Sequence, residues 1–168
     1  MKIEDLKDIL ISKKCNFVIL GSDTKSEHII TNLLNDIGSF EIKNLNEKTN
    51  IEQLVRSTKL SYILDDNLDN LDNYKNFNVL NIDINNIVIK NNSNPILESK
   101  LRSNLLRKIS CENNKTLILK TQLYIAPGEV YDHKLIGGKS NLFVCDLAIK
   151  IINNELIVVK NRHYNYFK

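Results

Sequence analysis

Short apolar runs that alternate with amphipathic stripes constrain the fold of this 168-residue chain more than any other feature. Residues 17–20 are continuously apolar and are followed by Gly21, a pattern typical of a strand buried on both faces of a parallel sheet. We expect Gly21 to end this strand. Apolar residues then recur at helical spacing, at Ile29, Ile30, Leu33, Leu34 and Ile37. This pattern predicts a helix that ends at Gly38.

The same alternation continues along the chain and predicts an α/β fold. Further strands are expected at residues 40–45, 61–64, 78–83, 116–121, 143–152 and 155–160, and helices at 2–13, 50–60, around 68–71 and from Pro95 onward. Residues 124–141 are expected to form a long loop, and Asn153-Asn154 a hairpin turn. We therefore predict one domain over residues 1–168, with an N-terminal helix within 1–14. Its mostly parallel sheet ends in an antiparallel hairpin.

Composition is that of a compact protein, because hydrophobic residues make up 42% of the chain. The N-terminal segment carries acids where a signal peptide needs bases. No apolar stretch approaches the roughly 20 residues that span a bilayer. Cys15, Cys111 and Cys145 are far apart and lack metal-ligand spacing, so we expect reduced thiols. These features predict a soluble intracellular protein, in cytoplasm or nucleus, without membrane contact.

Charge is distributed unevenly along the chain. Residues 1–96 hold 11 Lys/Arg and 14 Asp/Glu, whereas residues 97–168 hold 12 Lys/Arg and 6 Asp/Glu. A basic half attracts phosphate backbones, which favours nucleic acid as a partner. The alternative is an ordinary solvated, lysine-rich surface.

The turn after the first strand carries Lys25 and Ser26, where a phosphate-binding loop belongs. In such a loop, backbone N–H groups and a helix N-terminus bind phosphates, the lysine reaches the β/γ-phosphates, and the hydroxyl holds Mg²⁺. The loop pattern GxxxxGK[ST] needs five residues between its first glycine and the lysine. Here only three separate Gly21 from Lys25, and none of them is glycine. An ordinary strand-to-helix turn that contains Lys-Ser is the alternative.

Two carboxylates follow predicted strands and are candidates for chemistry. Asp83 ends the strand of residues 78–83, in the position of an aspartate that supports Mg²⁺. Glu47 follows the strand of residues 40–45 and could activate a water as general base. Each also has a structural alternative, because aspartates often end strands and glutamates are common at surfaces.

The C-terminal half resembles the RecA/Rad51/RadA recombinases, and replicative helicases of the DnaB type share the broader layout. The resemblance is carried by residues 116–122, Pro127-Gly128, Gly137-Gly138, Asp146 and residues 158–162, in that order, and extends over about 15–163. It implies a three-layer RecA-like P-loop NTPase fold. Such a fold requires the strand of residues 116–121 to lie between those of residues 17–20 and 78–83.

The resemblance also implies roles for individual residues. Gly21, Lys25, Ser26 and Asp83 would bind ATP, with Ser26 and Asp83 at the Mg²⁺. Glu47 would position water, Gln122 would sense the γ-phosphate, and Lys160 and Arg162 would reach a neighbouring subunit's nucleotide. The mobile loop of residues 124–136 and the Gly-Gly after it would contact single-stranded DNA, through Lys134, Gly137, Gly138 and Lys139. The partners implied are single-stranded DNA and either further copies of the chain or a RecA-like relative.

Departures from the family pattern leave three functions open. The shortened turn favours a DNA-binding protein of recombination, repair or replication with weak or lost ATPase activity. An active DNA-dependent ATPase with a short P-loop is the second. A RecA-fold scaffold without catalysis is the third.

Overall fold

The computed structural model describes residues 1–42, 45–47, 62–64, 77–88, 95–112, 114–136 and 138–162. Its helices are α1 (Ile3–Ile11), α2 (Glu27–Asp36), α4 (Pro95–Glu112) and α5 (Gly138–Val144), with a short 3₁₀ helix η3 (Ile84–Asn86). Its strands are β1 (Phe17–Ser22), β2 (Phe40–Ile42), β3 (Leu45–Glu47), β4 (Tyr62–Leu64), β5 (Val79–Asp83), β6 (Ile87–Val88), β7 (Thr116–Ile125), β8 (His133–Leu135), β9 (Leu147–Ile152) and β10 (Glu155–Asn161). The helices predicted at residues 50–60 and around 68–71 lie outside the described residues.

The main sheet has seven strands in the order β10-β9-β1-β7-β5-β2, with β8 paired to β7. The β9–β1, β1–β7, β7–β5 and β5–β2 pairs are parallel, and β10 is antiparallel to β9. Strand β7 therefore lies between β1 and β5, as the RecA-like fold requires. The predicted α/β architecture with a C-terminal antiparallel hairpin is confirmed.

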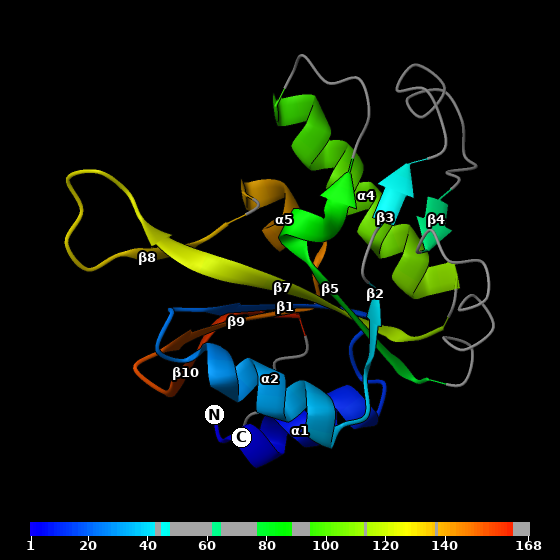
Figure 1. The fold of residues 1–168 in the computed structure, drawn as a ribbon, viewed down its shortest axis with the longest axis horizontal. Coiled ribbons are helices and arrows are strands. Elements are labelled where there is room, and N and C mark those ends of the chain that lie inside the picture. Colours follow the sequence, from blue (N-terminus) through cyan, green and yellow to red (C-terminus); the bar gives the residue numbers. More distant parts are fainter. Residues whose placement is uncertain are drawn as a thin grey trace.

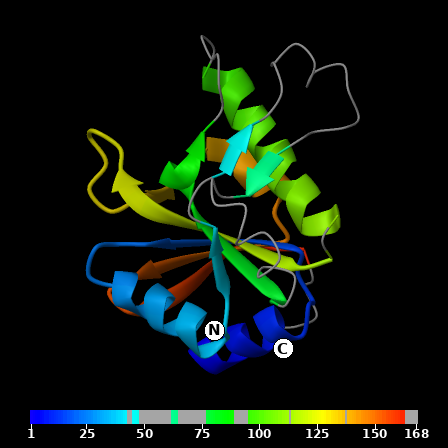
Figure 2. The same ribbon diagram turned by 45° about the vertical axis from the view of Figure 1, so that its right-hand side comes forward.

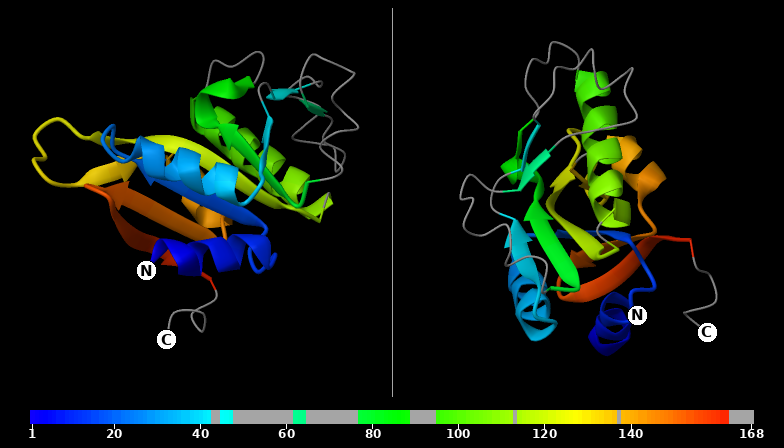
Figure 3. Two further views of the ribbon diagram at one scale, coloured as in Figure 1. Left: turned by 60° about the horizontal axis from the view of Figure 1, so that its bottom comes forward. Right: turned by 90° about the vertical axis from the view of Figure 1, so that its right-hand side faces the viewer.

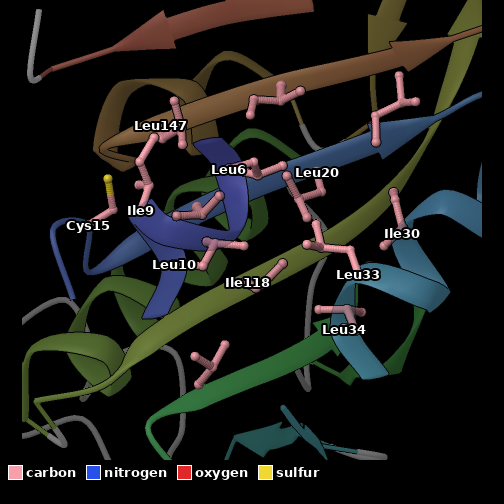
Figure 4. Close-up of a cluster of buried hydrophobic side chains, with 14 residues drawn as sticks. Leu6, Ile9, Leu10, Cys15, Leu20, Ile30, Leu33, Leu34, Ile118 and Leu147 are labelled. Atoms are coloured by element: carbon pink, nitrogen blue, oxygen red, sulfur yellow. The ribbon is translucent and has the colours of Figure 1, made fainter. Parts of the chain in front are cut away.

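Helices cover both faces of the sheet (Figures 1 and 2), with α1 and α2 on one face and α4 and α5 on the other. Successive residues of a strand point to opposite faces. Val18 and Leu20 of β1 accordingly join the apolar cluster of α1 and α2 (Figure 4), whereas Phe17 and Ile19 join that of α4 and α5. These two clusters form the core on either side of a doubly covered sheet.

The local turn chemistry agrees with the sequence. Asn153 and Asn154 both adopt positive φ, 49° and 67°, in the hairpin between β9 and β10, as the favoured two-residue hairpin turn requires. Gly38 follows α2 with φ of 65°. Cys15 and Cys145 are buried free thiols, and burial raises the pKa of each to about 11, which makes both poor nucleophiles. No helix within the described ranges is long and apolar enough to cross a membrane.

Four sequence predictions are corrected. Gly21 does not end the first strand, because β1 runs on to Ser22. Tyr62–Leu64 pairs antiparallel with β3 in a separate sheet of order β4-β3-β6, so it is not a strand of the main sheet. Residues 124–141 are not one loop, since β7 continues to Ile125 and pairs with β8. Phe143 and Val144 belong to α5, and β9 starts at Leu147.

Replacing Leu20 by alanine tests the central role of β1. Leu20 is fully buried at the centre of the sheet, so L20A should lower the free energy of unfolding by about 2–5 kcal/mol. Ile11 is 55% exposed at the end of α1, and I11A should change the free energy of unfolding by less than about 0.5 kcal/mol. Chemical denaturation followed by circular dichroism measures both. Equal losses in the two variants would contradict the placement of β1.

Candidate functional site at the carboxyl edge of the main sheet

The parallel strands β1, β7 and β5 end at one edge and bring predicted site residues together. In the strand register Ser22 lies opposite Gln122, and Lys120 lies opposite Asp83. These four residues also line one small cavity of about 60 Å³ at this edge, together with Glu27, Ile30, Thr31 and Thr121. Asp83 and Gln122 therefore meet beside the turn after β1, whereas Lys25 is exposed and is not among the lining residues.

The carboxylate of Asp23 occupies the turn itself. It accepts hydrogen bonds from the backbone N–H of Ser26 at 2.8 Å and from that of Asn153 at 3.0 Å. The Ser26 hydroxyl, with these two amides, holds the pKa of Asp23 below its ordinary value of 3.8. Asp23 thus supplies, from within the chain, the anion that backbone amides at a helix N-terminus favour.

Ser26 and Gly21 are also committed to internal contacts. Ser26 is fully buried at the start of α2, and its Oγ accepts the backbone N–H of Asn154 at 3.0 Å. Gly21 lies inside β1, where an added Cβ would stand 2.1 Å from Cδ2 of Leu135. The glycine therefore lets β8 pack closely against β1.

The residues at this edge do not fit ATP with Mg²⁺. The cavity of about 60 Å³ is far smaller than the roughly 300–1,000 Å³ that small-molecule sites usually enclose. Glu27, Asp83 and Lys120 all line it, so its described lining lacks the excess of positive charge that would attract a triphosphate. Asp83 Oδ1 accepts the backbone N–H of Asn85 at 2.9 Å and so caps η3. The RecA-like layout can hold such a site, but the turn in this chain is filled by Asp23.

Glu47 is placed away from the end of a main-sheet strand. It lies on β3, where its backbone is opposite Tyr62 of β4 in the smaller sheet. The prediction that Glu47 acts as general base assumes that it follows the second strand of the main sheet, which in the structure is the shorter β2. The catalytic role of Glu47 stays a prediction.

Lys160 and Arg162 bind the carboxyl end of α5 in their own chain. Lys160 Nζ donates to the carbonyls of Leu142 and, at 2.9 Å, Phe143. Arg162 Nη2 donates to the carbonyl of Phe143 at 2.7 Å, and Arg107 Nη1 donates to that of Val144 at 3.1 Å. These cations satisfy carbonyls that a helix leaves without partners and complement its dipole. Arg162 Nη1 also lies 3.6 Å from Oδ1 of Asp146. The role of Lys160 and Arg162 across a subunit boundary stays a prediction.

Strands β7 and β8 form an arm that extends away from the rest of the molecule (Figures 1 and 3). The predicted DNA-contacting Lys134 lies on it, with Nζ 2.8 Å from Oε2 of Glu129 and 3.8 Å from Oδ2 of Asp132. Its hydrogen bond to Glu129 raises the pKa of Lys134. The positive charge of Lys134 is thus largely neutralised by its neighbours.

Lys139 lies elsewhere, in a groove between α4 and α5. Gly138 begins α5, while Gly137 lies outside the described residues. The groove has a volume of about 430 Å³, within the range of small-molecule sites, and its lining residues are Lys100, Ser103, Asn104, Lys139, Ser140, Phe143 and Val144. Two of these residues are lysines, and none of those in the described part of the chain is a carboxylate.

Ser103, which lines this groove, belongs to a buried polar pair. Ser103 donates from Oγ to Oδ1 of Asn141 at 2.5 Å, and both side chains are almost fully buried. Nδ2 of Asn141 has no hydrogen-bond acceptor among the described residues. Phe143, by contrast, is 77% exposed at the rim. The groove therefore combines cations, an exposed aromatic ring and hydrogen-bonding capacity.

Several residues of these sites were missed by the sequence analysis, among them Asp23, Lys120, Lys100 and Phe143. Asp23 carries a readable signal, because an aspartate shortly before a helix, here three residues before the N-cap Ser26, commonly accepts backbone N–H groups. Lys120 and Lys100 carry none, since their positions depend on strand order and on helix packing.

No family model matches the chain, and no curated protein matches it. Among solved structures it is similar to a KaiC-like protein from the hyperthermophilic archaeon Pyrococcus horikoshii, with 20% identity and a TM-score of 0.39. That match covers 88% of this chain and 79% of the other. The observed strand order, and not this likeness, carries the fold assignment.

Replacing Asp23 by alanine tests its place in the turn. Because the pKa of Asp23 is lowered in the folded chain, the carboxylate stabilises the fold above its unfolded-state pKa of about 3.9. D23A should therefore cost about 1 kcal/mol near pH 7. The difference from the unsubstituted protein should vanish as the pH falls through the lowered folded-state pKa.

Urea denaturation at several pH values measures this difference. Asp8 is exposed on α1, and D8A serves as the matched control with little effect. A D23A penalty that is the same at pH 7 and pH 2 would show that the carboxylate charge is not what holds the turn.

Proposed function

We propose that this chain is a RecA-fold protein that binds single-stranded DNA, in recombination, repair or replication, without hydrolysing ATP. The observation that carries the proposal is the α4–α5 groove, in which Lys100 and Lys139 flank a cavity of about 430 Å³ beside Phe143. Single-strand binding sites combine cations that follow the backbone with aromatic rings on which bases stack. The groove offers both.

The helical spacing of the lining residues supports a shared binding surface. Lys100 and Asn104 are four residues apart on α4, and Lys139 and Phe143 are four apart on α5. Residues at this spacing lie on the same face of a helix. A phosphate between the two lysines would leave its base close to the Phe143 ring, while Asn104 and Ser140 offer hydrogen bonds.

The charge distribution supports the same partner. Both groove lysines belong to residues 97–168, where Lys/Arg exceed Asp/Glu by 12 to 6. Such an excess attracts nucleic acid over a distance of about a Debye length and makes binding dependent on salt. The exposed ring of Phe143 favours unpaired bases, because bases in a duplex are already stacked.

The residues at the carboxyl edge of the main sheet support the part of the proposal that excludes ATP hydrolysis. Asp23 takes the turn amides, Ser26 is bound to the hairpin turn, and the cavity is far smaller than a nucleotide. A second candidate, a scaffold without nucleic-acid binding, is favoured by the same filled turn. It is distinguished from the proposal by whether the groove binds DNA at all.

Titration of a fluorescently labelled single-stranded oligonucleotide tests DNA binding. Affinity should fall as salt rises, and K100A and K139A should each reduce the salt slope by about 0.7. F143A should weaken binding by about 1–3 kcal/mol with an unchanged slope, since it removes stacking alone. K2A, on the opposite helical layer, is the charge-matched control.

The variant K134A tests in the same titration whether the β7–β8 arm contributes to DNA binding. The lysine is already paired with Glu129, so its loss should change affinity less than that of Lys139. A larger effect of K134A than of K139A would move the DNA site to the arm. Binding without salt dependence in the unsubstituted protein would refute the proposal altogether.

Calorimetric titration with ATP and Mg²⁺ tests the second half of the proposal. We expect no saturable heat up to about 1 mM nucleotide, and no phosphate release with or without DNA. K25A should behave like the unsubstituted protein in both assays. Turnover that requires Mg²⁺ and disappears in K25A and D83A would instead establish an ATPase with a short phosphate loop.

A further inference from the structure

The two lysines of the α4–α5 groove have no partner in the described part of the chain. Lys100 and Lys139 are both exposed, and neither forms an ion pair or a hydrogen bond with a residue that the structure describes. Lysines elsewhere are paired with carboxylates, among them Lys7, Lys120, Lys134 and Lys150. The ammonium groups of the groove are therefore available to a ligand.

Contacts between α4 and α5 place both lysines at the same end of the groove. Ser103 of α4 is hydrogen-bonded to Asn141 of α5, and Arg107, four residues later, reaches the carbonyl of Val144. The two helices, which lie side by side in Figure 1, therefore run past each other in the same general direction. The groove lysines precede the first of these contacts by three residues on α4 and by two on α5.

The opposite end of the groove carries an aromatic ring. Asn104 and Phe143 each follow a groove lysine by four residues, a rise of about 6 Å along a helix. Phe143 is 77% exposed, and Val144 lines the groove beside it. Arg107 lies near this end but already donates to the carbonyl of Val144. The groove thus has a cationic end and a stacking end.

This polarity fits the end of a strand better than its interior. Within a strand, every base lies between two phosphates, whereas the described lining of the groove has lysines at one end alone. A phosphodiester carries a single negative charge, but a terminal phosphate monoester carries about −1.5 to −2 near pH 7. Two lysines, with no carboxylate among the lining residues that the structure describes, balance the charge of a monoester.

We propose that the groove binds the phosphorylated end of a single DNA strand. The terminal phosphate monoester lies between Lys100 and Lys139, and the last base stacks on the ring of Phe143. The volume of about 430 Å³ is in the range of a site for one small molecule. This inference rests on the proposed DNA binding, and it adds that the groove distinguishes a phosphorylated end from the rest of the strand.

Competition against a labelled single strand tests this preference. The competitors are short thymidine oligonucleotides with a 5′-phosphate, with a 3′-phosphate, or with hydroxyls at both ends. A hydroxyl-ended oligonucleotide two nucleotides longer has the same total charge as the phosphorylated ones and is the matched control. One phosphorylated form should bind about tenfold more tightly than this control, because only its end carries two charges on one phosphate.

Variants of the groove separate its two ends. K100A and K139A should each reduce the preference for the phosphorylated end to about twofold or less, whereas K139R keeps the cation and should retain most of it. F143A should weaken phosphorylated and hydroxyl-ended strands by the same factor, since it removes stacking alone. K2A, outside the groove, should leave the preference unchanged.

The charge of the terminal phosphate can also be changed by pH. Its second ionisation occurs near pH 6, so the preference should shrink when the pH is lowered from 7.5 to 5. The hydroxyl-ended strand, measured at each pH, accounts for titration of groups on the protein. A preference that is the same at both pH values would overturn the proposal.

The remaining outcomes distinguish this inference from DNA binding itself. Equal affinity for phosphorylated and charge-matched hydroxyl-ended strands would overturn end recognition, while binding that depends on salt and on both lysines would leave the proposed function standing. No binding of any strand would remove both. Free dTMP should bind more weakly than the phosphorylated oligonucleotide, and equal affinity would assign the groove to a free nucleotide and overturn its assignment to a strand end.

Discussion

All six residues of β1 are buried, and the strand hydrogen-bonds to β7 on one side and β9 on the other. Its alternate side chains contribute to both apolar clusters, so each helical layer packs against the same strand. Because its two neighbours run parallel to it, the three strands end at a common edge. The position of the turn after β1, and of every residue near it, follows from this arrangement.

At that edge the chain provides its own anion. Asp23 joins the turn before α2 to the hairpin turn between β9 and β10, through the N–H groups of Ser26 and Asn153. A bound phosphate would have to displace a carboxylate that is covalently part of the chain and already hydrogen-bonded to both amides. The same covalent tether that makes Asp23 an effective cap therefore makes the turn a poor site for a diffusing nucleotide.

Basic residues are used in two different ways in the C-terminal half. Lys160, Arg162 and Arg107 converge on the last carbonyls of α5 and fix the helix end to β10 and α4. Lys100 and Lys139, in contrast, line the groove between the helices. The cations of the C-terminal half thus include some that hold the structure together and others that line an accessible groove.

Most strands and helices could be predicted from the sequence because their signals are local. The apolar run before Gly21, the helical stripe before Gly38 and the paired asparagines at 153 and 154 each depend on residues close in the chain. Predictions failed where pairing is non-local: Tyr62–Leu64 has a strand pattern, but that pattern does not say which sheet it joins. Likewise, β7 extends to Ile125 because β8 pairs with it.

In the candidate site too, some features could be predicted from the sequence and others depended on contacts between distant segments. The residues at the carboxyl edge, including Asp83 and Gln122, could be placed together in advance, since parallel strands end on one side of a sheet. What could not be foreseen is which partners satisfy each charge. Lys160 binds α5, Lys134 binds Glu129, and Asp23 takes the turn amides. Local residue patterns thus determined the helices and strands and their order along the chain. The partners of the charged groups were decided by contacts between segments up to 130 residues apart. Such contacts exist only once the sheet has formed.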